Sequence, residues 1–332
     1  MKFLKYSITQ VILSVIISSA IILILFAKVD FSRVLSIVAR SNPFLIILAV
    51  VISIGINIFL GTVKWQRILT ALGCPLTYSE VLSIRSGCIP LKVIFPVKSS
   101  EILKAVYLNK QKNLPFGRAV SSLLLDKTLN LFVTAVLFLL GVFFVSLRLF
   151  PLALFSVFLL VVIFLLLFSR KTRMAFIDVA KRIHPRFRSF MVQLLSGFED
   201  ISLKEKGILL FYSLLFQISE FINTFILFMA IGITVPFYLI LVFVPLIMAV
   251  NNAPVTILGL GTREAMILFL FAPYGDTPLL LSSGILISFI EHVLPVVFGL
   301  FFLREFITFA SAKKEVILKG KGYESSTYKS AF

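Results

Sequence analysis

Long apolar blocks separated by short polar segments are the main pattern in this chain, and they predict membrane-spanning helices. A helix needs about 20 apolar residues to cross a hydrocarbon core about 30 Å thick. Such blocks must be helical, because lipid offers no partner for the backbone groups of an open strand. The blocks long enough to span are 8–27, 44–63, 119–145, 152–168, 207–231 and 280–303.

Two further apolar segments are interrupted, and they predict helical hairpins that enter the membrane without crossing it. Residues 79–110 form apolar runs of about ten residues, broken by prolines such as Pro96 and by a polar stretch around Lys98. Residues 236–272 are broken by Asn-Asn-Ala-Pro and then by a Gly-x-Gly turn. Two broken hairpins are typical of transporters built from inverted repeats. The alternative is that each segment forms two short tilted spans, which gives eight or more crossings.

Composition and charge support this class and predict an orientation. Hydrophobic residues make up 59% of the chain and charged residues 14%, against about 25% charged in soluble domains. The net charge of +17 suggests nucleic acid until the basic residues are placed. With the N-terminus in the cytoplasm, 26 of the 32 Lys and Arg residues lie inside and four outside. We therefore expect an inner or plasma membrane protein with both termini cytoplasmic, and no nucleic-acid partner.

The chain reads as one transmembrane domain over residues 1–306, with a basic cytoplasmic loop at 170–206 and a cytoplasmic tail at 307–332. Its first apolar block exceeds the 7–15 residues of a signal peptide, which predicts a retained anchor. Cys74 and Cys88 fall in the predicted cytoplasmic half, where thiols stay reduced. No spacing of Cys or His suggests a metal site, and we expect no cofactor.

Charged residues in the first broken segment are candidates for phosphate binding. Glu101 and Lys104 are three residues apart and share a helix face, and Lys98 precedes them. A helix that begins after Pro96 would offer free amides beside two lysines, a combination that suits a phosphate. The alternative is an interfacial helix whose lysines extend to the headgroups.

The second broken segment carries Arg263 and Glu264 directly after Gly259 and Gly261. An ionisable residue within a membrane segment costs about 2.5–3.5 kcal/mol and usually faces a cavity or a partner. The glycines would let the backbone turn sharply or approach a ligand. Function is the favoured interpretation, and a structural ion pair is the alternative.

Other polar residues lie within the predicted spans. Asp126 and Lys127 are neighbours that could neutralise each other. Glu291 and His292 could form a proton relay or an interhelical hydrogen bond. Helical spacing gives one mid-helix polar stripe, made of Gln217, Glu220, Asn223 and Thr224.

Taken in order, these motifs resemble the flippase-like transmembrane region of the lysylphosphatidylglycerol synthase family. The resemblance covers about residues 40–310. Ser100 stands where the family usually has Gly, and Glu291-His292 where a basic residue is expected. The residues that match the family's motifs are Pro96, Lys98, Glu101 and Lys104, then Asp126 and Lys127, then Pro254, Gly259, Gly261, Arg263 and Glu264.

The resemblance implies that the chain moves a lipid between leaflets, with its synthesis left to a separate domain that we do not expect in this chain. The cargo would be an anionic, aminoacylated, glycosylated or polyprenyl lipid. Lys98, Lys104 and Arg263 would meet the phosphate of its headgroup. Glu101 and Glu264 would hold those cations or contact an amine or sugar.

Two other classes of function stay open. A glycosyltransferase-like enzyme acting on a lipid-linked substrate needs carboxylates on an external loop, and the predicted outer loops offer only Asp30 and Asp276. A scaffold that does not transport would act with a separate lipid-synthesising enzyme as its partner.

Overall fold

The computed structural model describes residues 31–94, 99–145, 201–251 and 259–304, and six isolated positions between them. Within these ranges the fold is helical and contains no strand. The predicted span 8–27, most of the span 152–168, most of the basic loop 170–206 and the tail 307–332 lie outside the described residues.

Four helices are long and apolar enough to cross a membrane, and they confirm four of the six predicted spans as helices. Two of them contain a π-helical segment, in which the helix is locally wider. The first span consists of α3 (Pro43–Val50), η1 (Val51–Asn57) and α4 (Ile58–Ala71). The second and third are α8 (Phe116–Val145) and α12 (Leu203–Ile231), and the fourth consists of α15 (Thr277–Ser288), η3 (Phe289–Val293) and α16 (Leu294–Leu300).

Shorter helices occupy the two broken segments. The first segment holds α5 (Tyr78–Gly87), α6 (Leu91–Ile94) and α7 (Ser99–Gln111). The second holds α13 (Phe237–Asn251) and α14 (Thr262–Leu270). None reaches the length of about 20 residues that a crossing requires. The membrane side from which each segment enters stays a prediction. The described remainder consists of α2 (Phe31–Arg40) and the 3₁₀ turn η2 (Ala272–Tyr274).

Local sequence explains where several helices begin and end. The Asn42 side chain accepts hydrogen bonds from the first amides of α3, and Pro43 follows it at the first helical position. Ser202 caps α12 in the same way. This helix ends at Gly232, whose φ of 91° is the left-handed conformation that glycine tolerates best.

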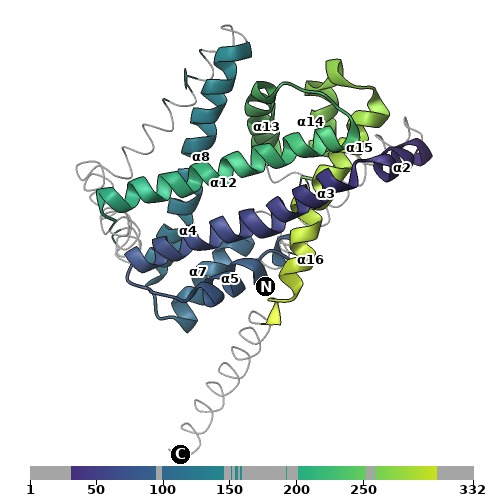
Figure 1. The fold of residues 1–332 in the computed structure, drawn as a ribbon. Helices are drawn as coiled ribbons and strands as arrows, with labels where there is room; N and C mark the ends of the chain where they lie inside the picture. The colour runs from purple at the N-terminus through teal and green to yellow at the C-terminus, as the bar shows by residue number, and fades with distance from the viewer. Residues whose placement is uncertain are drawn as a thin grey trace, which may run out of the picture.

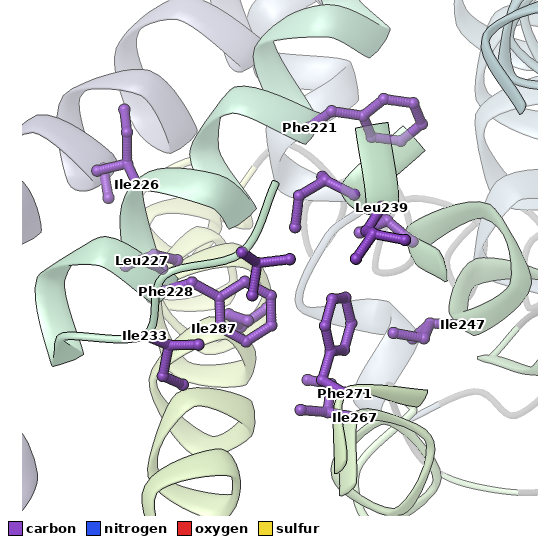
Figure 2. Packing of buried hydrophobic residues seen from close by; sticks show 14 of the residues in the cluster. Phe221, Ile226, Leu227, Phe228, Ile233, Leu239, Ile247, Ile267, Phe271 and Ile287 are labelled. Atoms are coloured by element: carbon purple, nitrogen blue, oxygen red, sulfur yellow. The ribbon is translucent and has the colours of Figure 1, made fainter. Parts of the chain in front are cut away.

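Two large apolar clusters and a small one between α8 and α13 hold the described helices together. Figure 1 shows α12 running alongside the first span, with α8 crossing behind it. One cluster, around Trp65, joins α4, α5, α7 and α8. The other joins α12 to α13, α14 and α15, where Phe228 and Phe271 stack with ring centroids 4.8 Å apart (Figure 2). Large apolar side chains also face outward, such as Phe269 at 76% exposed, as expected of a surface in contact with lipid.

The two π-helical segments are in contact. Ser53 of η1 donates a hydrogen bond from Oγ to the carbonyl oxygen of Ile290 in η3, over 2.9 Å. Both partners are buried. Single π-helical turns within α-helices are frequent at functional sites. This contact therefore draws attention to the space beside η1 and η3.

Candidate functional site

A cavity of about 780 Å³ lies between the spans and the two broken segments. Apolar side chains such as Leu131 and Val244 form part of its wall. The ionisable residues that line it come from α5, α6, α7, α8, α12, α14 and η3, and they are Arg85, Lys92, Glu101, Asp126, Lys127, Glu220, Arg263, Glu291 and His292. A space of this size within apolar helices, with converging polar groups, is the usual form of a ligand site.

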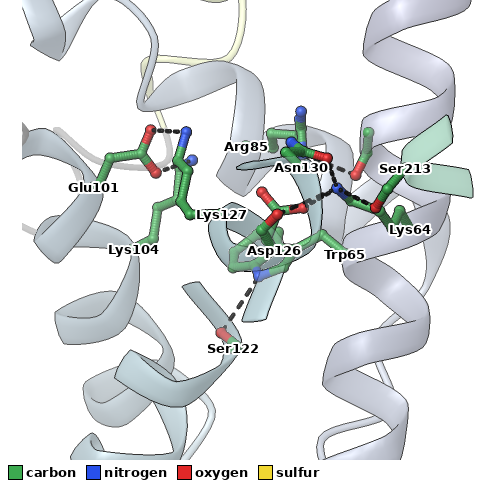
Figure 3. Close-up of polar contacts among 11 residues, drawn as sticks. Lys64, Trp65, Arg85, Glu101, Lys104, Ser122, Asp126, Lys127, Asn130 and Ser213 are labelled. Atoms are coloured by element: carbon green, nitrogen blue, oxygen red, sulfur yellow. Dashed lines mark hydrogen bonds and ion pairs between the residues drawn. The ribbon is translucent and has the colours of Figure 1, made fainter. Parts of the chain in front are cut away.

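Lys64 and Asp126 form a buried ion pair beside the cavity. The Lys64 ammonium lies 2.8 Å from Asp126 Oδ1, and its side chain is 1% exposed. It also donates to Asn130 Oδ1 over 2.6 Å and to Ser213 Oγ over 3.3 Å, which joins α4 to α8 and α12 (Figure 3). A buried charge needs such a full set of partners to offset its desolvation. The pair therefore fixes the packing of three spans.

Glu101, a predicted site residue, holds three lysines from different elements. Its carboxylate lies 2.9 Å from Lys104 and 3.6 Å from Lys127 (Figure 3). It also lies 3.4 Å from Lys92. Lys104 is almost buried and also lies over the ring of Trp65. It is not among the residues that line the cavity. Lys92 and Lys127 do line it, and their side chains are 39% and 55% exposed.

Asp126 and Lys127 do not pair with each other, although they are neighbours in the sequence. Asp126 pairs with Lys64, and Lys127 lies near Glu101. Consecutive residues of a helix point in directions about 100° apart, so each meets a different partner. This geometry assigns one residue to each of the two charged clusters.

Arg263 and Glu264 occupy the start of α14, and both are buried. Glu264 accepts hydrogen bonds from the Gly261 amide, over 2.6 Å, and from the Ser288 hydroxyl. Arg263 donates to Ser288 over 2.9 Å and lies 2.7 Å from His292 Nε2. The Glu264 side chain thus caps its own helix, while the Arg263 side chain reaches the cavity wall.

The glycines before α14 both have positive φ, 77° at Gly259 and 87° at Gly261. Left-handed backbone costs about 1–2 kcal/mol for other residues. A Cβ at Gly259 would also lie 2.8 Å from Cγ of Asn251, at the end of α13. Asn251 in turn accepts a hydrogen bond from Thr262, over 3.1 Å. The turn is therefore tight enough to bring the end of α13 against the start of α14.

Glu220 and Glu291 place carboxylates at the cavity with neutral partners. Glu220 accepts from Gln217 Nε2 over 3.2 Å, and Glu291 accepts from Asn223 Nδ2 and the Thr224 hydroxyl, each over 3.2 Å. The polar stripe of α12 therefore connects to η3. In the described part of the chain, no Lys or Arg nitrogen lies within ion-pair distance of either carboxylate.

Sequence reasoning missed three cations of this region. Lys64 directly follows the predicted span 44–63, yet α4 continues past it to Ala71. Arg85 and Lys92 stand in the first broken segment without a motif around them. Only their burial and partners in three dimensions reveal them. Pro96, Lys98 and Pro254, which were predicted, lie outside the described residues.

Metal binding finds no support in the part of the chain that the structure describes. There, no group of three or more His, Cys, Asp or Glu side chains is placed to hold an ion. Asp276, a carboxylate considered for an external enzymatic site, caps α15 by accepting from the Leu279 amide and pairs with Arg33 at 2.6 Å. The Asp276 side chain therefore stabilises the start of α15 and its contact with α2.

Comparison with known proteins agrees with this architecture. The sequence model of the lysylphosphatidylglycerol synthase transmembrane region matches residues 11–299. A relative is the UPF0104 membrane protein MJ1595 of Methanocaldococcus jannaschii, 21% identical over 319 residues, which are 89% of this chain and 95% of the relative. The match includes both broken segments and all four described spans. The chain is thus a multi-pass membrane protein that belongs to the lysylphosphatidylglycerol synthase transmembrane-region family.

Proposed function

We propose that this protein is a lipid translocase that moves a phosphate-bearing lipid between leaflets through the central cavity. The observation that carries the proposal is the cavity itself, whose wall combines apolar side chains with exposed cations. A headgroup needs polar partners inside the membrane, and the acyl chains need an apolar path. A cavity with both surfaces serves both parts of a lipid.

Cations near Glu101 favour an anionic headgroup. Lys92 and Lys127 face the cavity, and each lies farther from Glu101 than Lys104 does. Lys104 satisfies Glu101 at short range, so the other two ammonium groups have donors to spare for a phosphate. Arg263 adds a cation from α14 to the same wall. Among the residues predicted for the site, Lys127 and Arg263 are thus the proposed headgroup contacts.

The direct test is transport in liposomes that contain the purified protein and trace phosphatidylglycerol with a fluorescent acyl chain. Dithionite bleaches the outer leaflet, so translocation raises the bleached fraction above that of protein-free liposomes. We expect Lys127→Ala to slow this loss of fluorescence about tenfold, which equals about 1.4 kcal/mol. Lys127 is half-exposed, so the variant should fold.

Lys110→Ala is the matched control. Lys110 is an exposed lysine in the last turn of α7, and it does not line the cavity. Its rate should equal that of the wild type. Repeating the assay with an aminoacylated and a glycosylated lipid compares the cargo classes. If the wild-type protein accelerates none of these lipids, the translocase proposal fails, and stable co-purification of a synthase would then support a scaffold.

A further inference from the structure

Arg85 has an arrangement that the ion pairs described above do not explain. It lies on α5, lines the cavity and is only partly buried. Its guanidinium donates one hydrogen bond, from Nη1 to the carbonyl oxygen of Gly61 over 2.8 Å. Among the described residues, no carboxylate lies within ion-pair distance of it. An arginine has five N–H donors, so most of its donors remain available.

The carboxylates nearest to this region already have partners. Asp126 is paired with Lys64, and Glu101 is shared by three lysines. Arg85, Asp126 and Lys127 all line the same cavity, which places them in one region (Figure 3). The five cations Lys64, Arg85, Lys92, Lys104 and Lys127 and the three carboxylates Glu101, Asp126 and Glu220 leave this region with a formal charge of +2. An excess of positive charge beside a cavity within membrane helices calls for an anion.

The missing side chain of Gly61 leaves the space that the Arg85 guanidinium occupies. A Cβ at position 61 would overlap the Cζ and Nη2 atoms of Arg85. Gly61 is buried in the first turn of α4, inside the continuous span Pro43–Ala71, where glycine costs helix stability relative to alanine. The absent side chain thus leaves room for the guanidinium of Arg85, a residue of the cavity wall, to lie directly against α4.

We propose that Arg85, held in place by Gly61, is the anchor for the phosphate group of the ligand in this cavity. The proposal rests on the proposed function and extends it to a binding residue and a positioning residue. A guanidinium presents paired N–H groups that match two phosphate oxygens, which an ammonium group cannot do. Lys92 and Lys127 would add charge beside it, whereas Arg85 sets the orientation of the phosphate.

The test measures binding rather than transport, by titration calorimetry on the full chain in a non-ionic detergent. The probes are dihexanoyl phosphatidylglycerol, dihexanoylglycerol, which lacks the phosphate, and inorganic phosphate. Arg85→Gln should weaken binding of the phospholipid about tenfold or more, because a charged hydrogen-bond donor is lost. It should leave the affinity for dihexanoylglycerol unchanged. Equal affinity of the wild type and Arg85→Gln for the phospholipid would overturn the proposal.

Gly61→Ala tests whether Gly61 positions the Arg85 guanidinium, and it does so without changing any charge. It should weaken phospholipid binding in the wild type, but have no further effect on binding when Arg85 is already Gln, because the clashing group is gone. Additive effects of the two substitutions on binding would overturn the positioning role. Gly207→Ala is the matched control, since a Cβ there meets no atom within 4 Å, and it should bind as the wild type does.

The remaining comparisons distinguish a lipid phosphate from free phosphate as the ligand, and the Arg85 proposal from the translocase proposal. Binding of dihexanoyl phosphatidylglycerol far above that of inorganic phosphate, both dependent on Arg85, supports a lipid headgroup. Comparable, Arg85-dependent binding of inorganic phosphate supports a free phosphate as the ligand of the same anchor. Arg85-dependent binding without transport in liposomes would sustain the anchor and remove the translocase function. Transport that survives Arg85→Gln with unchanged binding would do the reverse.

Discussion

Two regions of the cavity wall hold buried charges in different ways. Near α4 and α8, charge meets charge: Lys64 pairs with Asp126 at 2.8 Å, and Glu101 pairs with Lys104 at 2.9 Å. Near α12 and η3, the carboxylate of Glu291 instead accepts hydrogen bonds from an amide and a hydroxyl. The same helix, α12, contributes to both regions, through Ser213 to the first and through Asn223 and Thr224 to the second.

The difference indicates which charges the fold depends on. Removing one partner of a buried ion pair leaves an isolated charge, which is strongly destabilising. Neutralising Glu291 breaks no ion pair among the described residues, because its carboxylate is held by neutral donors. The ion pairs of the first region therefore hold the helices together. In the second region, Glu291 can lose its charge while the helices stay in place.

The largest effect is expected at the ion pair of the first region. Lys64→Met should lower the free energy of unfolding by about 3–5 kcal/mol, because Asp126 is left buried without its cation. Unfolding by sodium dodecyl sulfate in mixed micelles measures this change. The double variant Lys64→Met/Asp126→Leu should recover most of the loss. If the double variant is as unstable as the single one, the ion pair is not the cause.

A smaller effect is expected in the second region. Glu291→Gln keeps an oxygen that accepts from Asn223 and Thr224. We expect a loss of about 1 kcal/mol or less in the free energy of unfolding, since no neighbouring cation loses an ion-pair partner. The same unfolding titration applies. A loss as large as that of Lys64→Met would show that the two regions do not differ.

The smallest effect is expected at a partly exposed ion pair, Glu80 and Lys112, which serves as a reference for both regions. Glu80, at the start of α5, accepts from Lys112 and from Thr77. The hydrogen bond from Lys112, followed by those from Thr77, lowers the pKa of Glu80 from 4.5 to about 2. A lowered pKa stabilises the fold above pH 4.5, and this contribution is lost as the pH falls toward 2.

Melting curves between pH 6 and pH 2 test this expectation, with Glu80→Gln as the comparison. The difference in melting temperature between the wild type and the variant should shrink as Glu80 becomes protonated. Because the Glu80 side chain is 40% exposed, solvent screens the interaction and the difference should be small. A difference that does not change with pH would contradict the assignment.

Hydropathy was enough to find the spans, and the reason is physical. The length of an apolar helix is set by the membrane, so four described spans follow directly from the sequence. The end of the first of them could not be placed, because Lys64 looks like a boundary until its partner is known. That partner, Asp126, lies 62 positions away in sequence, and sequence spacing does not reveal such a contact.

Site residues could be predicted from the sequence where a charged residue interrupts an apolar segment. Arg263 and Glu264 stand out because charge is rare within the second broken segment. Arg85 does not stand out, because its role depends on the missing side chain of Gly61 on another helix. The detail that separates Lys104 from Lys127 is also spatial, since both contact Glu101 and only Lys127 faces the cavity.

The wide turn in the first span has a consequence for how this chain can vary. In η1 the hydrogen bonds skip one residue more than in an α-helix, so the segment accommodates the equivalent of one inserted residue. Deleting one residue between Val51 and Asn57 would convert the wide turn to α-helix and leave the following residues facing as before, whereas deleting one residue between Ile58 and Leu60 would turn everything after it by about 100°. Gly61 would move off Arg85, and Lys64 would move off Asp126, in a single step. The register of this span, and not only its side chains, therefore encodes the cavity.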